Sequence, residues 1–192
     1  SGTGANNNTA IGAHAMEFST SAENCTALGA LALDANTTGG SNTALGRSAL
    51  SDNTTSSSNT GVGYFASQAN TTGAHNTAIG SFSQHVNTTG SHNTSIGKSS
   101  LGANTTGTYN TALGRQALSL NTTSDYNTGV GYHALYVNTA AENTAVGSNS
   151  LVTNTTGTKN AALGAWSLRF NTTGDFNTAA GYQALTANTT AD

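Results

Sequence analysis

The chain has 192 residues, of which 35% are hydrophobic and only 7% are charged, and it contains 23 Gly and no Pro. So little bulky hydrophobic material argues against an ordinary globular domain with one large core, while a formal net charge of only −3 argues against the highly charged class of disordered chains. With five Lys and Arg against eight Asp and Glu, the sequence does not predict nucleic-acid binding. It has no apolar run of membrane-spanning length, so it does not predict membrane insertion either.

A 17-residue unit recurs along almost the whole chain. The spacing is 17 residues throughout except for one step of 16, from Asn127 to Asn143. Units begin at Asn8, Cys25, Asn42, Asn59, Asn76, Asn93, Asn110, Asn127, Asn143, Asn160 and Asn177. We therefore expect residues 1–192 to form one repetitive segment, and, since neither end carries an atypical capping unit, a fragment of a longer fibre.

Each unit, numbered here as repeat positions 1 to 17, predicts two short strands. Positions 2–4 and 7–11 have period-2 character, as in 111–113 and 116–120, and they are separated by Gly at position 5 and by an Asn-Thr-Thr-Gly-like turn from position 12. Abundant Asn, Thr and Gly disfavour helix. The expected fold is all-β, a parallel β-solenoid or β-roll of about eleven 17-residue coils.

Apolar residues recur at positions 4 and 9. Position 4 is apolar in every unit, and position 9 is Leu or Met except at Ser67 and Gln84. Those two units carry Phe65 and Phe82 at position 7, which has the same parity along a strand as position 9. We expect positions 4 and 9 to fill the coil interior, with each Phe replacing the missing Leu.

Positions 3 and 8 hold only small residues. Ala, Ser or Gly occupies position 3 and Ala or Ser occupies position 8, for example at Ala44, Ala112, Ala117 and Ala184. If position 4 faces the interior, position 3 faces the other way, and the absence of large side chains there indicates close-packed protein. This pattern predicts parallel chains packed or intertwined as a homotrimer.

Asn columns at positions 1 and 12 and Thr columns at positions 2 and 13 predict hydrogen-bonded ladders between coils. Much of the order is expected to come from these repeated polar contacts.

The unit resembles two groups of fibrous proteins. Asn-Thr-Ala-Leu-Gly followed by a small residue and Leu, as in 110–118 and 42–50, resembles the head repeats of trimeric autotransporter adhesins, which wind into left-handed parallel β-rolls held as a trimer. The longer form with Asn-Thr-Thr-Gly, as in 171–174, is similar to repeat arrays of phage and virus tail-fibre proteins and bacterial surface proteins, which often precede a self-cleaving intramolecular chaperone. The adhesin repeat is shorter than this unit, so the motif does not fix the handedness of the roll.

Two groups of aromatic residues are candidate glycan-binding sites. Position 17 carries a column of His75, His92, Tyr109 and Tyr126, whose alternative interpretation is a tolerated variable turn position. Positions 6 and 7 carry Tyr64, Tyr132, Tyr182 and Trp166, whose alternative role is to cover the core edge beside the Gly turn. No metal site, cofactor or catalytic residue is predicted.

Two functions from different classes remain open. The first is a structural and adhesive trimeric fibre segment of a viral tail fibre or cell-surface adhesin, on the virion or outside the cell, contributing to host or glycan attachment. The alternative is an ice-binding solenoid, because position 13 is Thr in every unit. Enzyme activity is not expected, since the eight acidic residues form no recurring pair.

Overall fold

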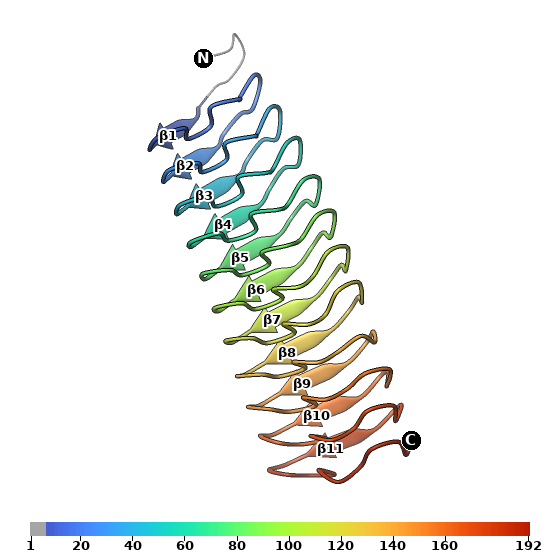
Figure 1. Cartoon of the computed structure of the whole chain (residues 1–192). Helices are drawn as coiled ribbons and strands as arrows, with labels where there is room; N and C mark the ends of the chain where they lie inside the picture. The colour runs from blue at the N-terminus through green and yellow to red at the C-terminus, as the bar shows by residue number, and fades with distance from the viewer. Residues whose placement is uncertain (1–6) are drawn as a thin grey trace.

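The structure is a single stack of coils, described for residues 7–192 by a computed structural model (Figure 1). Each repeat supplies one short strand, and the strands form one eleven-stranded parallel sheet in chain order. The strands are β1 Thr9–Ile11, β2 Thr26–Leu28, β3 Thr43–Leu45, β4 Thr60–Val62, β5 Thr77–Ile79, β6 Thr94–Ile96, β7 Thr111–Leu113, β8 Thr128–Val130, β9 Thr144–Val146, β10 Ala161–Leu163 and β11 Thr178–Ala180. The predicted all-β parallel solenoid is confirmed, and residues 7–192 contain no helix.

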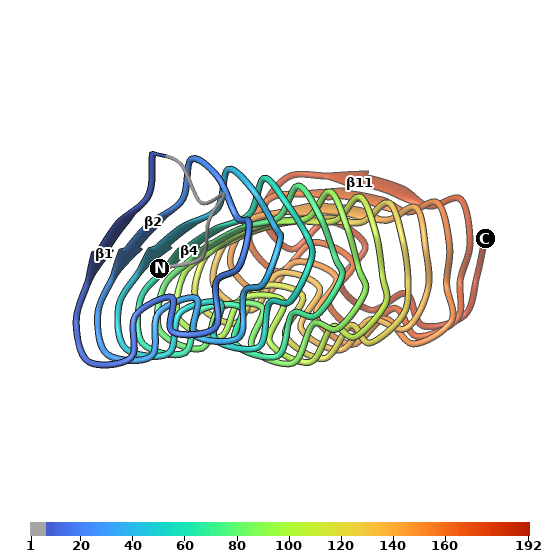
Figure 2. The same ribbon diagram turned by 90° about the horizontal axis from the view of Figure 1, so that it is seen from above.

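Neighbouring strands of the sheet pair at equivalent repeat positions. Thr94 pairs with Thr111, Ser95 with Ala112 and Ile96 with Leu113, and the other neighbouring strands pair in the same way. Equivalent residues therefore lie one inter-strand spacing apart, about 4.8 Å. The sheet also twists along the stack, so that β1 and β11 point in different directions (Figure 2). No helix that could span a bilayer occurs in the described part of the chain.

The second predicted strand does not form. Positions 7–11 are turns, and positions 7 and 9 have left-handed backbone angles, as at Gln116 (φ 58°) and Leu118 (φ 52°). Left-handed residues interrupt the alternation of side chains that an extended strand imposes. As a result, positions 8 and 9 both point into the coil, and Ala117 and Leu118 are each fully buried.

The two faces of the observed strand are the reverse of those predicted. Ala44 is fully buried inside its own coil, whereas the neighbouring Leu45 is 42% exposed. The reason is the narrow interior: a Cβ added to Gly61, at position 3, would lie 3.0 Å from Leu50 Cγ. Only Ala, Ser or Gly fits between the sheet and the position 8–9 segment. The small columns are therefore buried within one chain, and the argument for a second chain from Ala44, Ala112 and Ala117 is wrong; Ala184, in the last coil, is half-buried.

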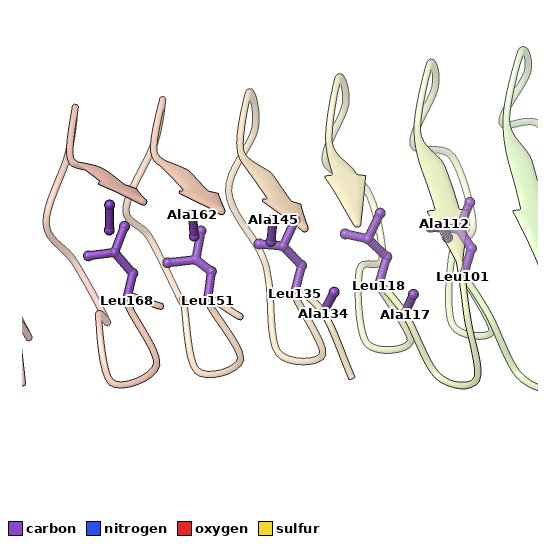
Figure 3. Close-up of a cluster of buried hydrophobic side chains, with 11 residues drawn as sticks. Leu101, Ala112, Ala117, Leu118, Ala134, Leu135, Ala145, Leu151, Ala162 and Leu168 are labelled. Atoms are coloured by element: carbon purple, nitrogen blue, oxygen red, sulfur yellow. The ribbon is translucent and has the colours of Figure 1, made fainter. Parts of the chain in front are cut away.

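Position 9 forms the core, as predicted. Its leucines stand one above another inside the stack, beneath the small residues of the sheet (Figure 3). The row is interrupted at Ser67 and Gln84, which are themselves buried there and divide the core into two clusters. Phe65 and Phe82 do not replace the missing leucines: both rings are half-buried, and they pack on each other with centroids 5.6 Å apart. The parity argument failed because position 7 is left-handed.

Polar ladders join the coils, as predicted for positions 1, 12 and 13. At position 12, most Asn amides donate to the Asn of the preceding coil, as from Asn104 Nδ2 to Asn87 Oδ1 at 2.8 Å. At position 1, the Asn oxygen accepts the next coil's backbone N–H, as from Asn110 to Asn93 Oδ1 at 2.9 Å. Position 13 hydroxyls donate to the next coil's carbonyl oxygens. Because the amides are buried, these bonds are protected from water, and each contributes about 0.5 to 1.5 kcal/mol.

Candidate functional site

The outward side of the sheet, called here the outer face, consists of repeat positions 2 and 4. Position 2 is Thr in ten strands and Ala161 in β10, and position 4 is aliphatic throughout. Seven position-4 side chains are exposed by 36% to 59%, namely Ile11, Leu28, Leu45, Ile79, Ile96, Val146 and Leu163. The outer face is thus a continuous uncharged stripe along the whole described stack.

The position 17 column that the sequence predicts is formed. The ring centroids of His75 and His92 lie 4.9 Å apart, those of His92 and Tyr109 4.8 Å apart and those of Tyr109 and Tyr126 5.1 Å apart, with interplanar angles of 12°, 0° and 1°. Sugars pack on the open face of an aromatic ring, and here the faces of His92 and Tyr109 are covered by their neighbours. Contact with a ligand is therefore limited to ring edges and to the two ends of the column.

The second aromatic group is divided among three places along the rod. Tyr64 packs against Phe65 with centroids 4.1 Å apart, and its hydroxyl accepts a bond from Arg47 Nη1 at 3.2 Å.

Further along the rod, Tyr132 stacks on His133 at 3.8 Å. Tyr182 lies 5.7 Å from Trp166, whose ring in turn lies under the guanidinium of Arg169. The four predicted residues do not form one site.

A notch that the sequence analysis missed lies on the coil side formed by positions 7, 10 and 11. It has a volume of about 400 Å³ and involves three successive coils. The middle coil contributes only small residues, Ser99, Gly102 and Ala103. The larger residues of the flanking coils are its walls: Phe82, His85 and Val86 on one side and Gln116, Ser119 and Leu120 on the other. The available signal was Gly102, the one Gly at position 10 in the eleven units.

Three acidic side chains lie near one another in the first coils: desolvation, and after it the negative charges of Glu17 and Asp52, raises the pKa of Asp34. His14 Nδ1 lies 2.6 Å from Glu17 Oε2 in an exposed pair. Cys25 is buried in the Asn column, and desolvation raises the pKa of its thiol. Within residues 7–192, no group of three His, Cys, Asp or Glu side chains is placed to hold a metal ion.

No family model, curated protein or solved structure matches this chain.

Proposed function

We propose that the chain is a structural and adhesive segment of a trimeric fibre, of the kind found in viral tail fibres or cell-surface adhesins, on the virion or outside the cell. The observation that carries this function is the outer face, with its stripe of exposed and half-exposed Leu, Ile and Val. No catalytic residue or cofactor is assigned.

The chemistry of the outer face supports assembly with copies of the same chain. Monomeric proteins rarely expose long contiguous apolar surfaces. An aliphatic side chain, of varying identity, recurs at position 4 of every coil, so a partner with the same coil spacing can match this column along its full length. Another copy of this chain has that spacing, and three copies close the arrangement around one axis with every stripe covered.

Two features favour a fibre over the ice-binding alternative. Thr hydroxyls of position 13, as in Thr88, already donate to a carbonyl oxygen of the next coil. The sheet twists along its length, whereas an ice-matching surface must be flat (Figure 2). A thermal-hysteresis assay tests this alternative directly, because clear activity would favour ice binding.

Light scattering during size-exclusion chromatography tests the assembly. We expect a mass three times that of the 19.1 kDa chain. Replacing Ile79 and Ile96 with Lys places two charges on the outer face, and the mass should fall to that of one chain while the circular dichroism spectrum is retained. The control carries the same two charges at exposed positions of the same coils, Thr89→Lys and Thr106→Lys, and should stay trimeric. A wild-type mass of one chain would contradict the proposed assembly.

A further inference from the structure

We infer that the notch at the middle coil is a binding site for one neutral six-membered sugar ring of a surface glycan. The notch is formed by repeat positions 7, 10 and 11 of the coils beginning at Asn76, Asn93 and Asn110. None of the eight residues named above as aromatic glycan candidates belongs to it.

The shape of the notch follows from the repeat. Phe82, Ser99 and Gln116 share position 7 of successive coils, so they are stacked at the inter-strand spacing of about 4.8 Å. Gly102 has no side chain where the flanking coils carry His85 and Ser119. The small side chains of the middle coil leave open space between the two walls, and we expect a single sugar ring to occupy it.

Each wall of the notch has an apolar part. Phe82 and Val86 lie on one side, and Leu120, which is 42% exposed, lies on the other. The Phe82 ring is held by edge-to-face packing on His85, with centroids 5.2 Å apart. Apolar walls of this kind suit the C–H faces of a sugar ring.

Polar groups at the rim suit the hydroxyls of the same ring. Ser99 and Ser119 contribute hydroxyls to the lining. Gln116 is oriented by His133, whose Nε2 lies 2.9 Å from Gln116 Oε1. Because an amide oxygen only accepts, His133 Nε2 donates this bond, and the Gln116 amide N–H groups remain available to the notch.

The charge state of the site favours a neutral ligand. Burial, and after it the positive charge of Arg115, lowers the pKa of His133, which favours its uncharged imidazole. The notch lining contains no Asp, Glu, Lys or Arg. A sialic acid or sulfated sugar would therefore find no Lys or Arg partner there, whereas an uncharged hexose finds both apolar surface and hydroxyl partners.

The position of the notch is compatible with assembly. Positions 8 and 9 pack against the inner side of the sheet, as in the 2.7 Å contact between Ser83 Oγ and Ser95 Oγ. The outward groups at positions 7, 10 and 11 are therefore on the side away from the outer face. This inference rests on the glycan-attachment part of the proposed function and not on trimer formation.

Saturation-transfer NMR with methyl glycosides of glucose, galactose, mannose and N-acetylglucosamine tests the site on the full chain. At least one glycoside should bind, with a dissociation constant of about 1 mM. Ala103→Leu should weaken it about tenfold or more, because the new side chain fills the gap. Leu fits this position, as Leu120 is the equivalent residue one coil later and makes the same backbone bond to the next coil.

The matched control is Ala35→Leu, the same change at position 11 of a distant coil, which should leave binding unchanged.

A second variant, Gln116→Leu, retains the shape of the notch, since Leu31 occupies position 7 with the same left-handed backbone. It should weaken binding of the sugar but not of toluene, an apolar ring probe. Absence of binding by all four glycosides, or equal binding by wild type and Ala103→Leu, would overturn the site. The light-scattering mass of each variant should remain that of wild type, which separates this outcome from a failure of the trimer.

Discussion

Asn121 and Asn138 occupy the same repeat position in adjacent coils, yet their side-chain amides are not hydrogen-bonded to each other. Asn138 Nδ2 donates to Ala140 O at 2.6 Å instead, and Asn121 Oδ1 is buried with no partner in the described structure. The cause is the 16-residue coil, in which the turn after Asn138 is one residue short. The ladder at position 12 is therefore interrupted at this coil.

Restoring the missing residue should repair the ladder. Inserting Gly after Ala140 gives the turn the Asn-Xaa-Xaa-Gly form of its neighbours, so Asn138 Nδ2 can reach Asn121 Oδ1. Chemical unfolding should show the free energy of unfolding raised by about 1 to 3 kcal/mol, the cost of leaving a buried acceptor unpaired. A Gly inserted after Gly107, in a coil that already has 17 residues, should lower it instead. Equal effects of the two insertions would contradict this account.

The buried polar side chain of Gln84, which interrupts the leucine core, is expected to lower the free energy of unfolding. Gln84 Oε1 is buried without a partner, in the column that Leu fills elsewhere. Gln84→Leu should raise the free energy of unfolding by about 1 to 3 kcal/mol, because it removes a desolvated polar atom and joins the two core clusters. Gln68→Leu, in the preceding coil but half-buried, is the control and should change stability little. A destabilised Gln84→Leu would show that the amide is required there.

Gly at position 5 is required by the close approach of successive coils. Gly114 has a φ of +129°, and a Cβ added to it would lie 2.6 Å from the carbonyl oxygen of Gly131. Gly114→Ala should lower the free energy of unfolding by about 3 kcal/mol or more, because backbone strain and a backbone clash both oppose the methyl group. Gly102→Ala, where the added Cβ lies 3.2 Å from Ser99 O, should have a much smaller effect. Chemical unfolding of the two variants beside wild type measures this difference.

Asp175 should make the free energy of unfolding depend on pH in the acidic range. Its Oδ1 accepts bonds from the backbone N–H of Thr158 at 2.5 Å and from the Thr158 hydroxyl at 2.9 Å, and these bonds hold the pKa of the carboxyl below its usual value. A lowered folded pKa stabilises the folded state above the ordinary Asp pKa of about 3.9, and this contribution is lost as the pH falls through the folded value.

Unfolding curves measured from neutral pH downward check this expectation. Asp175→Asn should be less stable than wild type at neutral pH, and the difference should shrink as the pH is lowered. Thr158→Val removes the hydroxyl donor but retains the backbone donor, so it should reduce the pH dependence without abolishing it. A pH-independent difference between wild type and Asp175→Asn would contradict the expected titration.

The repeat made the overall fold predictable, because in-register stacking converts sequence columns into spatial columns. The Asn ladder and the His75 to Tyr126 column follow from that rule alone. The repeat did not predict which strand side chains face the coil interior. That prediction assumed side chains that alternate along an extended backbone, whereas Gln116 and Leu118 have left-handed backbone angles. Ala112 then faces a narrow interior, and Leu113 faces outward.

The notch was harder to predict than the columns. The notch forms because one coil has smaller side chains than the two coils beside it. Gly102 contributes to it only because His85 and Ser119 lie on either side of it in space. A search for recurring chemistry detects the shared features of the units and passes over a single coil whose side chains are small.

Contacts between coils connect each residue with its equivalent 17 positions away, as in the bond from Asn104 to Asn87. Recombination between repeats in the encoding DNA can therefore delete or duplicate a whole unit and leave every remaining neighbour matched. The length of such a molecule can therefore change in steps of one coil while its cross-section stays the same.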